Sequence, residues 1–108
     1  MEISVSELAK VRESAQAPVL LDVREDFERE IAVIPPKNCQ EVHIPMGDLS
    51  QRWQELAKEK PIVVYCHAGG RSGRAAQFLL QHGFLSVRNL VGGIDRWASE
   101  LDPSMERY

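Results

Sequence analysis

Short continuous runs of apolar residues alternate along this chain with stretches in which apolar residues recur every three or four positions. The continuous runs at 19–23 and 62–66 are typical of strands that are covered on both faces of a parallel sheet. In contrast, Leu49, Trp53 and Leu56 share one stripe, as in an amphipathic helix. Strands and helices are therefore expected to alternate.

The same pattern, read along the whole chain, predicts an α/β domain. Strands are expected at 19–23, 39–44, 62–66 and 84–91, and helices at 25–31, 49–58, 73–82 and 94–101. A further helix begins at Ser4 or Ser6 and reaches about residue 14. Asp48 and Ser72 are the expected caps of two later helices, and Gly83 is the expected stop signal. This order predicts a single domain, residues 1–108, with a mainly parallel sheet flanked by helices on both faces.

Size and composition narrow the classes of protein. The chain has 108 residues, of which 44% are hydrophobic and 27% charged, as in an ordinary globular domain with one core. No apolar run is long enough to cross a bilayer, and the first residues show no secretory signal, so a cytoplasmic location with no membrane partner is expected. The net charge of −3 argues against a nucleic-acid partner.

The two cysteines, Cys39 and Cys66, are expected to be free thiols, because disulfides are rare in a reducing compartment. Cysteines and histidines are too scattered for a zinc site, so no metal and no cofactor are predicted.

The segment that follows the strand at 62–66 carries the strongest chemical signal. Ligands of parallel sheets gather at the carboxyl ends of strands, where Cys66 lies. Gly69 and Gly70 permit a backbone whose N–H groups point inward around an anion, and Arg71 adds a fixed positive charge. The start of a helix also favours a thiolate, which is the nucleophilic form of cysteine. Cys66 is therefore predicted to be a nucleophile, although a strand-end cysteine by itself is more often a buried core residue.

Here the sequence resembles the rhodanese-like domains over nearly its whole length. The matching residues are Tyr65, Cys66, Gly69, Arg71, Ser72, Ala75, Ala76, Gly83, Phe84, Val87, Leu90, Gly92, Gly93 and Trp97. Upstream, the strand Leu20-Leu21-Asp22-Val23-Arg24-Glu25 with Glu28 is similar to the family's Leu-Asp-Val-Arg-Glu strand, and Ile44-Pro45 leads to Asp48-Leu49 as in its central helix.

The resemblance implies a sulfurtransferase. The Cys66 thiolate would take the outer sulfur of a donor such as thiosulfate, become a persulfide, and pass the sulfur to cyanide, a thiol or a sulfur-carrier protein. Cys66 is then the catalytic residue. The expected substrate-binding residues are His67, Ala68, Gly69, Gly70, Arg71 and Ser72. Asp22 and Arg24 are expected to form a structural pair that ties their strand to neighbouring loops.

Two other functions stay open at this point. Cysteine phosphatases and arsenate reductases also place Arg-Ser or Arg-Thr after a cysteine, but they hold one residue more than the four between Cys66 and Arg71. A non-catalytic binding module or a persulfide relay is the other alternative, and a relay would have the same sequence features.

One segment departs from the family. Where rhodanese-like domains have Gly-His-Ile and then Gly-Ala, this chain reads Ala-Val-Ile-Pro-Pro-Lys-Asn-Cys at 32–39, which leaves open the shape of the pocket and the identity of the sulfur donor. Cys39 lies in this segment, and both roles stay open for it, an incidental thiol and a thiol that resolves a persulfide on Cys66. The tail 102–108 resembles the ends of rhodanese domains fused to enzymes that activate sulfur-carrier proteins.

Overall fold

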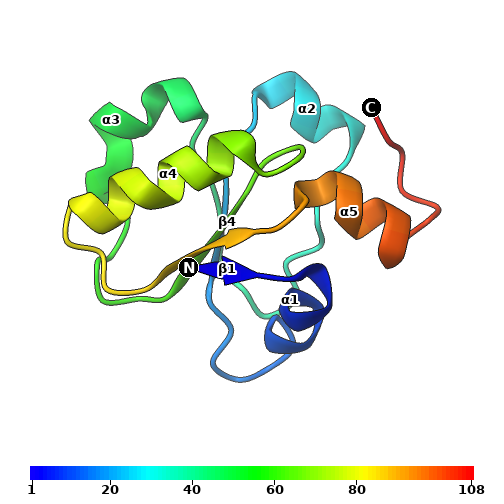
Figure 1. Ribbon diagram of the computed structural model, residues 1–108, viewed down its shortest axis with the longest axis horizontal. Helices are drawn as coiled ribbons and strands as arrows, with labels where there is room; N and C mark the ends of the chain where they lie inside the picture. Colours follow the sequence, from blue (N-terminus) through cyan, green and yellow to red (C-terminus); the bar gives the residue numbers. More distant parts are fainter.

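The computed structural model describes residues 1–108 and is built on a five-stranded parallel sheet with the order β1-β5-β4-β2-β3 (Figure 1). The strands are β1 (Glu2–Ile3), β2 (Val19–Asp22), β3 (Glu41–His43), β4 (Ile62–Tyr65) and β5 (Val87–Leu90). Every residue of β2 and β4 is buried, as expected from their continuous apolar runs. The prediction of a mainly parallel sheet is confirmed.

Helices cover both faces of this sheet. They are α1 (Val5–Val11), α2 (Asp26–Ile31), α3 (Leu49–Arg52), α4 (Gly70–Gln81) and α5 (Gly93–Glu100), with two 3₁₀ turns, η1 (Met46–Asp48) and η2 (Trp53–Glu55). In Figure 1, α3 and α4 lie together on one side of the strands, and α1 and α5 on the other. None of these helices has the length and apolar character needed to cross a membrane.

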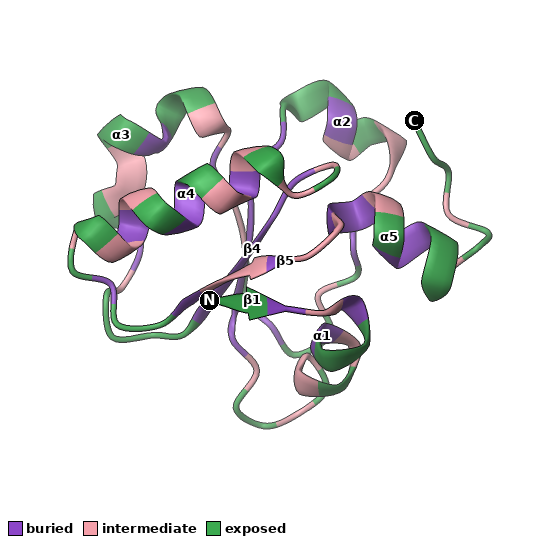
Figure 2. Ribbon diagram, in the orientation of Figure 1, coloured by how far each residue is buried: buried purple, intermediate pink, exposed green.

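The two faces of the sheet carry separate cores. Ile62 and Val64 of β4 pack with residues of α3 and α4, whereas Val63 and Tyr65 pack with residues of α1 and α5. Figure 2 shows the buried stripes of α4 and α5 turned toward the central strands. Because side chains alternate along β4, Cys66 falls on the α4 side.

The start of α4 differs from the prediction. The sequence predicted a helix over 73–82 capped by Ser72, but α4 begins at Gly70 and its N-cap is Gly69, in the left-handed conformation. Ser72 lies in the first turn of the helix, where its hydroxyl bonds to other groups. The helix therefore begins closer to Cys66 than expected, which brings its first N–H groups within reach of the sulfur.

The helix predicted at 49–58 is also shorter. It divides into α3 and the tighter turn η2, and Asp48 makes no side-chain capping bond. The chain becomes extended at Leu56, which is buried in the core beneath α4. The helical segment therefore ends where Leu56 enters the core.

Of the two serines predicted as possible caps of the first helix, Ser4 is the cap and forms a reciprocal bond with Glu7. The helix ends at Val11, earlier than the predicted end near residue 14. Strand β1 was not predicted. It has two residues, too few for a periodic signal, and it pairs with β5 at the edge of the sheet.

Candidate active site

The Cys66 thiol lies directly after β4 and faces the first turn of α4. Only 1% of the residue is exposed. Its sulfur accepts hydrogen bonds from the Gly69 amide at 3.1 Å, the Ser72 amide at 3.4 Å and the Ser72 hydroxyl at 3.2 Å. Three donors around one sulfur are the surroundings that a thiolate needs.

These donors set the protonation state of Cys66. Burial alone acts to raise the pKa of the thiol, because it disfavours the charged form. The hydrogen bonds from the Ser72 hydroxyl and amide and from the Gly69 amide, together with the nearby amide of Ala68, act in the opposite direction and leave the pKa of Cys66 lowered. Ala68 thus contributes its backbone N–H, not its side chain.

The two glycines of the loop do different things. Gly69 has φ +112°, a backbone conformation that strains other residues, and this turn aims its amide at the sulfur. Gly70 has an ordinary backbone, and a Cβ there would meet nothing within 4 Å. The expectation that both glycines need special backbone freedom is therefore confirmed for Gly69 and wrong for Gly70.

Asn89 of β5 is part of the site, although it was not predicted from the sequence. Its Oδ1 accepts from the Ser72 hydroxyl at 2.6 Å, and its Nδ2 donates to the Gly69 carbonyl at 3.2 Å. The hydroxyl has one proton, so Asn89 and the Cys66 sulfur compete for it. The signal available in the sequence was a polar amide inside the segment 84–91, which was predicted to hold a strand.

The start of α5 holds the other side of the loop. The Ile94 and Asp95 amides donate to the carbonyls of Cys66 and His67, each at 3.0 Å. Gly93, with φ +60°, lets this helix start approach so closely that a Cβ would lie 2.4 Å from the His67 carbonyl oxygen. Two helix starts therefore fix the backbone around the sulfur.

Arg71 does not hydrogen-bond to the sulfur. Its guanidinium forms two bonds to the Glu28 carboxylate of α2, at 2.7 and 2.9 Å. The bonds from Arg71 are the main reason that the pKa of Glu28 is lowered to about 2. The charge that Arg71 brings to the loop is therefore partly balanced by Glu28.

His67, predicted to bind substrate, and the pair Asp22 and Arg24, predicted to be structural, make no hydrogen bond to the Cys66 sulfur. The His67 ring stacks on the Tyr108 ring and makes no hydrogen bond to Cys66. Asp22 and Arg24 form a fully buried ion pair at 2.9 Å, and Arg24 also donates to the carbonyls of Glu28 and Ala32. These contacts join β2 to α2 and to Ala32, which ends that helix, so the pair is structural as predicted.

Cys39 and the atypical segment lie elsewhere. Cys39 is buried in the core on the α1 and α5 side, whereas Cys66 belongs to the core on the α4 side. Ile34 is fully buried in the same core as Cys39, and Arg12 of the α1 end donates to the Pro35 carbonyl. The sheet therefore separates Cys39 from the Cys66 thiol, and both cysteines are free.

The two thiols are expected to differ in their reaction with iodoacetamide. The pKa of Cys66 is lowered, whereas burial raises the pKa of Cys39. Because the thiolate reacts, alkylation of Cys66 should rise with pH at a lower midpoint than alkylation of Cys39. Peptide mapping of the wild-type protein at a series of pH values measures both midpoints.

Two variants test which groups lower the pH midpoint of Cys66 alkylation. Ser72→Ala removes a hydrogen bond to a charged group and should raise the midpoint by about one pH unit. Arg71→Ala should raise it less, because Glu28 already pairs with that charge. A Cys66 midpoint at or above the Cys39 midpoint in the wild-type protein would contradict the conclusion that the loop lowers the pKa of Cys66.

Comparison with known proteins adds the family context. The model of the rhodanese-like domain family matches residues 4–100. The chain is 38% identical over 102 residues to the Bacillus subtilis protein YtwF, named as a sulfurtransferase, with 94% of each chain covered. It is 33% identical over 97 residues to a sulfurtransferase of Allochromatium vinosum, covering 90% of this chain and 87% of the other. The crystal structure of a rhodanese-related protein from Thermoplasma volcanium superposes with a TM-score of 0.80 at 33% identity, covering 93% of this chain and 92% of that one.

Proposed function

The chain belongs to the rhodanese-like domain family, and we propose that it is a sulfurtransferase in which Cys66 carries the transferred sulfur. The observation that supports this most is the set of donors around the sulfur, two amides and the Ser72 hydroxyl within 3.4 Å. Relatives named as sulfurtransferases support a transferase of the rhodanese kind. Thiosulfate as donor, and a thiol or a sulfur-carrier protein as acceptor, are the specific parts of the proposal.

The reaction has two half-reactions. In the first, the Cys66 thiolate attacks the outer sulfur of thiosulfate, a new S–S bond forms, and the old S–S bond breaks as sulfite leaves with its electron pair. In the second, a nucleophile such as cyanide or a thiolate attacks the outer sulfur of the persulfide and Cys66 leaves as a thiolate. The amides of Gly69 and Ser72 stabilise the anionic sulfur at both stages, since they are already in place before the reaction.

The shape of the loop supports sulfur transfer over phosphatase chemistry. Four residues separate Cys66 from Arg71. A tetrahedral oxyanion needs donors on several oxygens, and an arginine that forms two bonds is well suited to this. Here both terminal nitrogens of the Arg71 guanidinium bond to Glu28, and the amides of Gly69 and Ser72 are aimed at the sulfur itself.

A binding module without catalysis is the other alternative. Such a module has no need of an ionised thiol, whereas here several donors act together to lower the pKa of a buried cysteine. A persulfide relay shares the first half-reaction and differs only in its acceptor. The lowered pKa therefore favours sulfur chemistry at Cys66 over binding alone.

The proposal is tested by two assays on the same protein. Thiocyanate formation from thiosulfate and cyanide should be readily measured, whereas hydrolysis of an aryl phosphate should stay at background. Cys39→Ser is the matched control and should behave as the wild-type protein does in both assays. Phosphate release that depends on Cys66, or the absence of any thiocyanate formation, would contradict the proposed function.

A further inference from the structure

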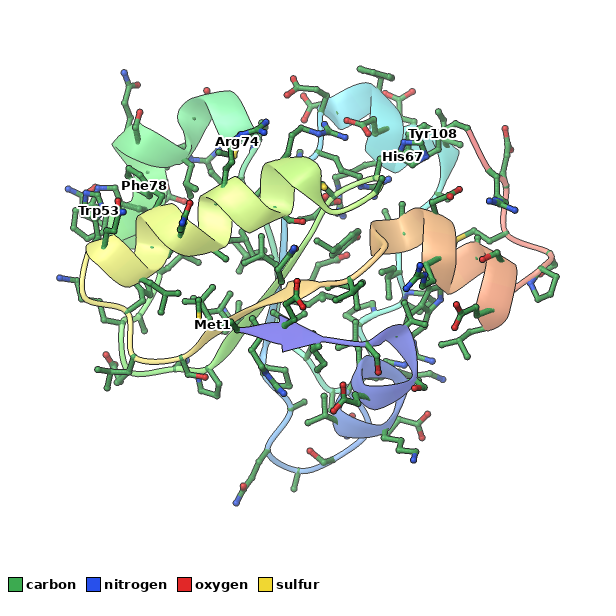
Figure 3. All side chains as sticks on the ribbon, in the orientation of Figure 1. Met1, Trp53, His67, Arg74, Phe78 and Tyr108 are labelled. Atoms are coloured by element: carbon green, nitrogen blue, oxygen red, sulfur yellow. The ribbon has the colours of Figure 1, made fainter.

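Tyr108 lies against the loop that contains Cys66, although it is far from that loop in the sequence. Its ring stacks on the His67 ring with the ring centres 4.2 Å apart and the planes 16° from parallel. Figure 3 shows these two labelled side chains together, between α2 and α5. Tyr108 therefore packs on the residue that directly follows the nucleophile.

The Tyr108 hydroxyl is held from two directions. It accepts a hydrogen bond from Arg24 Nη1 at 2.9 Å and donates one to Glu28 Oε2 at 2.8 Å. Arg24 is fully buried and paired with Asp22, so the first partner is a rigid part of the core. Hydrogen bonds to charged groups are stronger than those between neutral groups, so the two bonds fix the position of the ring.

This position connects both ends of the loop. The ring contacts His67, one residue after Cys66, and the hydroxyl bonds to the carboxylate that holds Arg71, five residues after Cys66. His67, Ile94 and Tyr108 also line one recess at the surface, so Tyr108 packs against both the loop and α5. Cys66 itself is only 1% exposed. Tyr108 therefore covers part of the loop that encloses a nearly closed thiol.

We propose that Tyr108 determines the size of the sulfur donor or acceptor that reaches Cys66, with its ring as a wall and its hydroxyl as the anchor of that wall. The inference rests on the proposed function in taking Cys66 as the reacting group. Small anions such as thiosulfate or cyanide can approach the thiol in the intact protein. Donors with a bulky substituent are disfavoured until the wall is displaced.

Alkylation of Cys66 measures access without sulfur transfer. The rates of reaction with iodoacetamide and with the bulky N-(1-pyrenyl)maleimide are compared, and peptide mapping separates Cys66 from Cys39. Tyr108→Ala should raise the ratio of the alkylation rate with the bulky reagent to the rate with the small reagent by about tenfold. This change corresponds to about 1.4 kcal/mol of activation free energy. Tyr108→Phe keeps the ring but loses both hydrogen bonds, and it should raise the ratio by a smaller factor.

The matched control is Phe27→Ala, which removes an aromatic ring of α2 that is 63% exposed. Its ratio should equal that of the wild-type protein. An unchanged ratio in Tyr108→Ala, or the same increase in Phe27→Ala, would overturn the proposal. An increase in Tyr108→Ala with no change in Tyr108→Phe would retain the wall and overturn the anchoring role of the hydroxyl.

A second measurement shows whether the same wall acts on sulfur donors. Benzenethiosulfonate carries a phenyl ring in place of one oxygen of thiosulfate, and the preference for thiosulfate in kcat/KM should fall in Tyr108→Ala but not in Phe27→Ala. Failure of sulfur transfer in the wild-type protein would contradict the proposed function, and the alkylation ratio would still decide the role of Tyr108. An unchanged donor preference in an active Tyr108→Ala protein would contradict this inference alone.

Discussion

Replacement of Cys66 by serine is expected to reduce sulfur transfer from thiosulfate to cyanide by roughly a thousandfold or more, as for the loss of other catalytic nucleophiles. A serine hydroxyl stays protonated at neutral pH and cannot form a persulfide. The smaller oxygen still accepts a hydrogen bond, so the Gly69 and Ser72 amides keep a partner. The loss should therefore be chemical, with little effect on folding. Thiocyanate formation by the purified variant measures it.

The control for this variant is Cys39→Ser. Cys39 is a buried core residue, as Cys66 is, but it lies on the opposite side of the sheet from the Cys66 thiol. Sulfur transfer by Cys39→Ser should stay within about twofold of the wild-type rate, because the loop and its donors are unchanged. Equal losses in the two variants would mean that the structural role of a buried thiol, not the Cys66 chemistry, accounts for the effect.

The second large effect is expected from Gly93→Ala. The added Cβ would lie 2.4 Å from the His67 carbonyl oxygen and 2.5 Å from the Cys66 carbonyl oxygen. Those carbonyls accept from the first amides of α5, so neither the helix nor the loop can move without breaking these bonds. Left-handed strain and overpacking together should lower the free energy of unfolding by roughly 2–4 kcal/mol. Denaturation with urea measures this loss.

Gly47→Ala is the matched control for Gly93→Ala. A Cβ at Gly47 meets nothing within 4 Å, and the backbone there is not left-handed. Its stability should change by less than about 1 kcal/mol, as for a surface substitution without steric conflict. If Gly93→Ala unfolds at the same urea concentration as Gly47→Ala, the close approach of α5 to the loop does not support the site.

The sequence was sufficient where a local pattern decides the structure. Strands β2 and β4 could be predicted from their continuous apolar runs alone, because a strand buried on both faces needs apolar side chains on both. The same holds for Cys66, since it follows β4 directly and precedes the glycine that turns the chain into α4. The parallel sheet and the position of the loop were therefore predictable from the pattern, and the family was predictable from the resemblance of the motifs.

Contacts between distant segments were not predictable in this way. Asn89 reaches Ser72 from a neighbouring strand, and its role depends on which strands pair. Tyr108 bonds to Glu28 across 80 residues of sequence. The pairing of Arg71 with Glu28 likewise depends on the placement of α2 beside the loop. Such bonds arise from the packed structure and leave no periodic signal.

Helix ends were predicted less well than helix cores, for a related reason. Serine and aspartate are good caps in isolation, which favoured Ser72 and Asp48. In the folded chain the Ser72 hydroxyl bonds to Asn89 and Cys66, and Gly69 takes the capping position because its left-handed backbone makes the turn. A side chain with a role in the site was thus mistaken for a helix signal.

The mass of the protein after reaction with thiosulfate tests the central claim most directly. The wild-type protein, incubated with thiosulfate and freed of excess reagent, should gain the mass of one sulfur atom. Peptide mapping should place that sulfur on Cys66, and cyanide should remove it. A protein that turns over thiosulfate without gaining sulfur, or that carries the sulfur on Cys39, would contradict the account of Cys66 as the sulfur carrier.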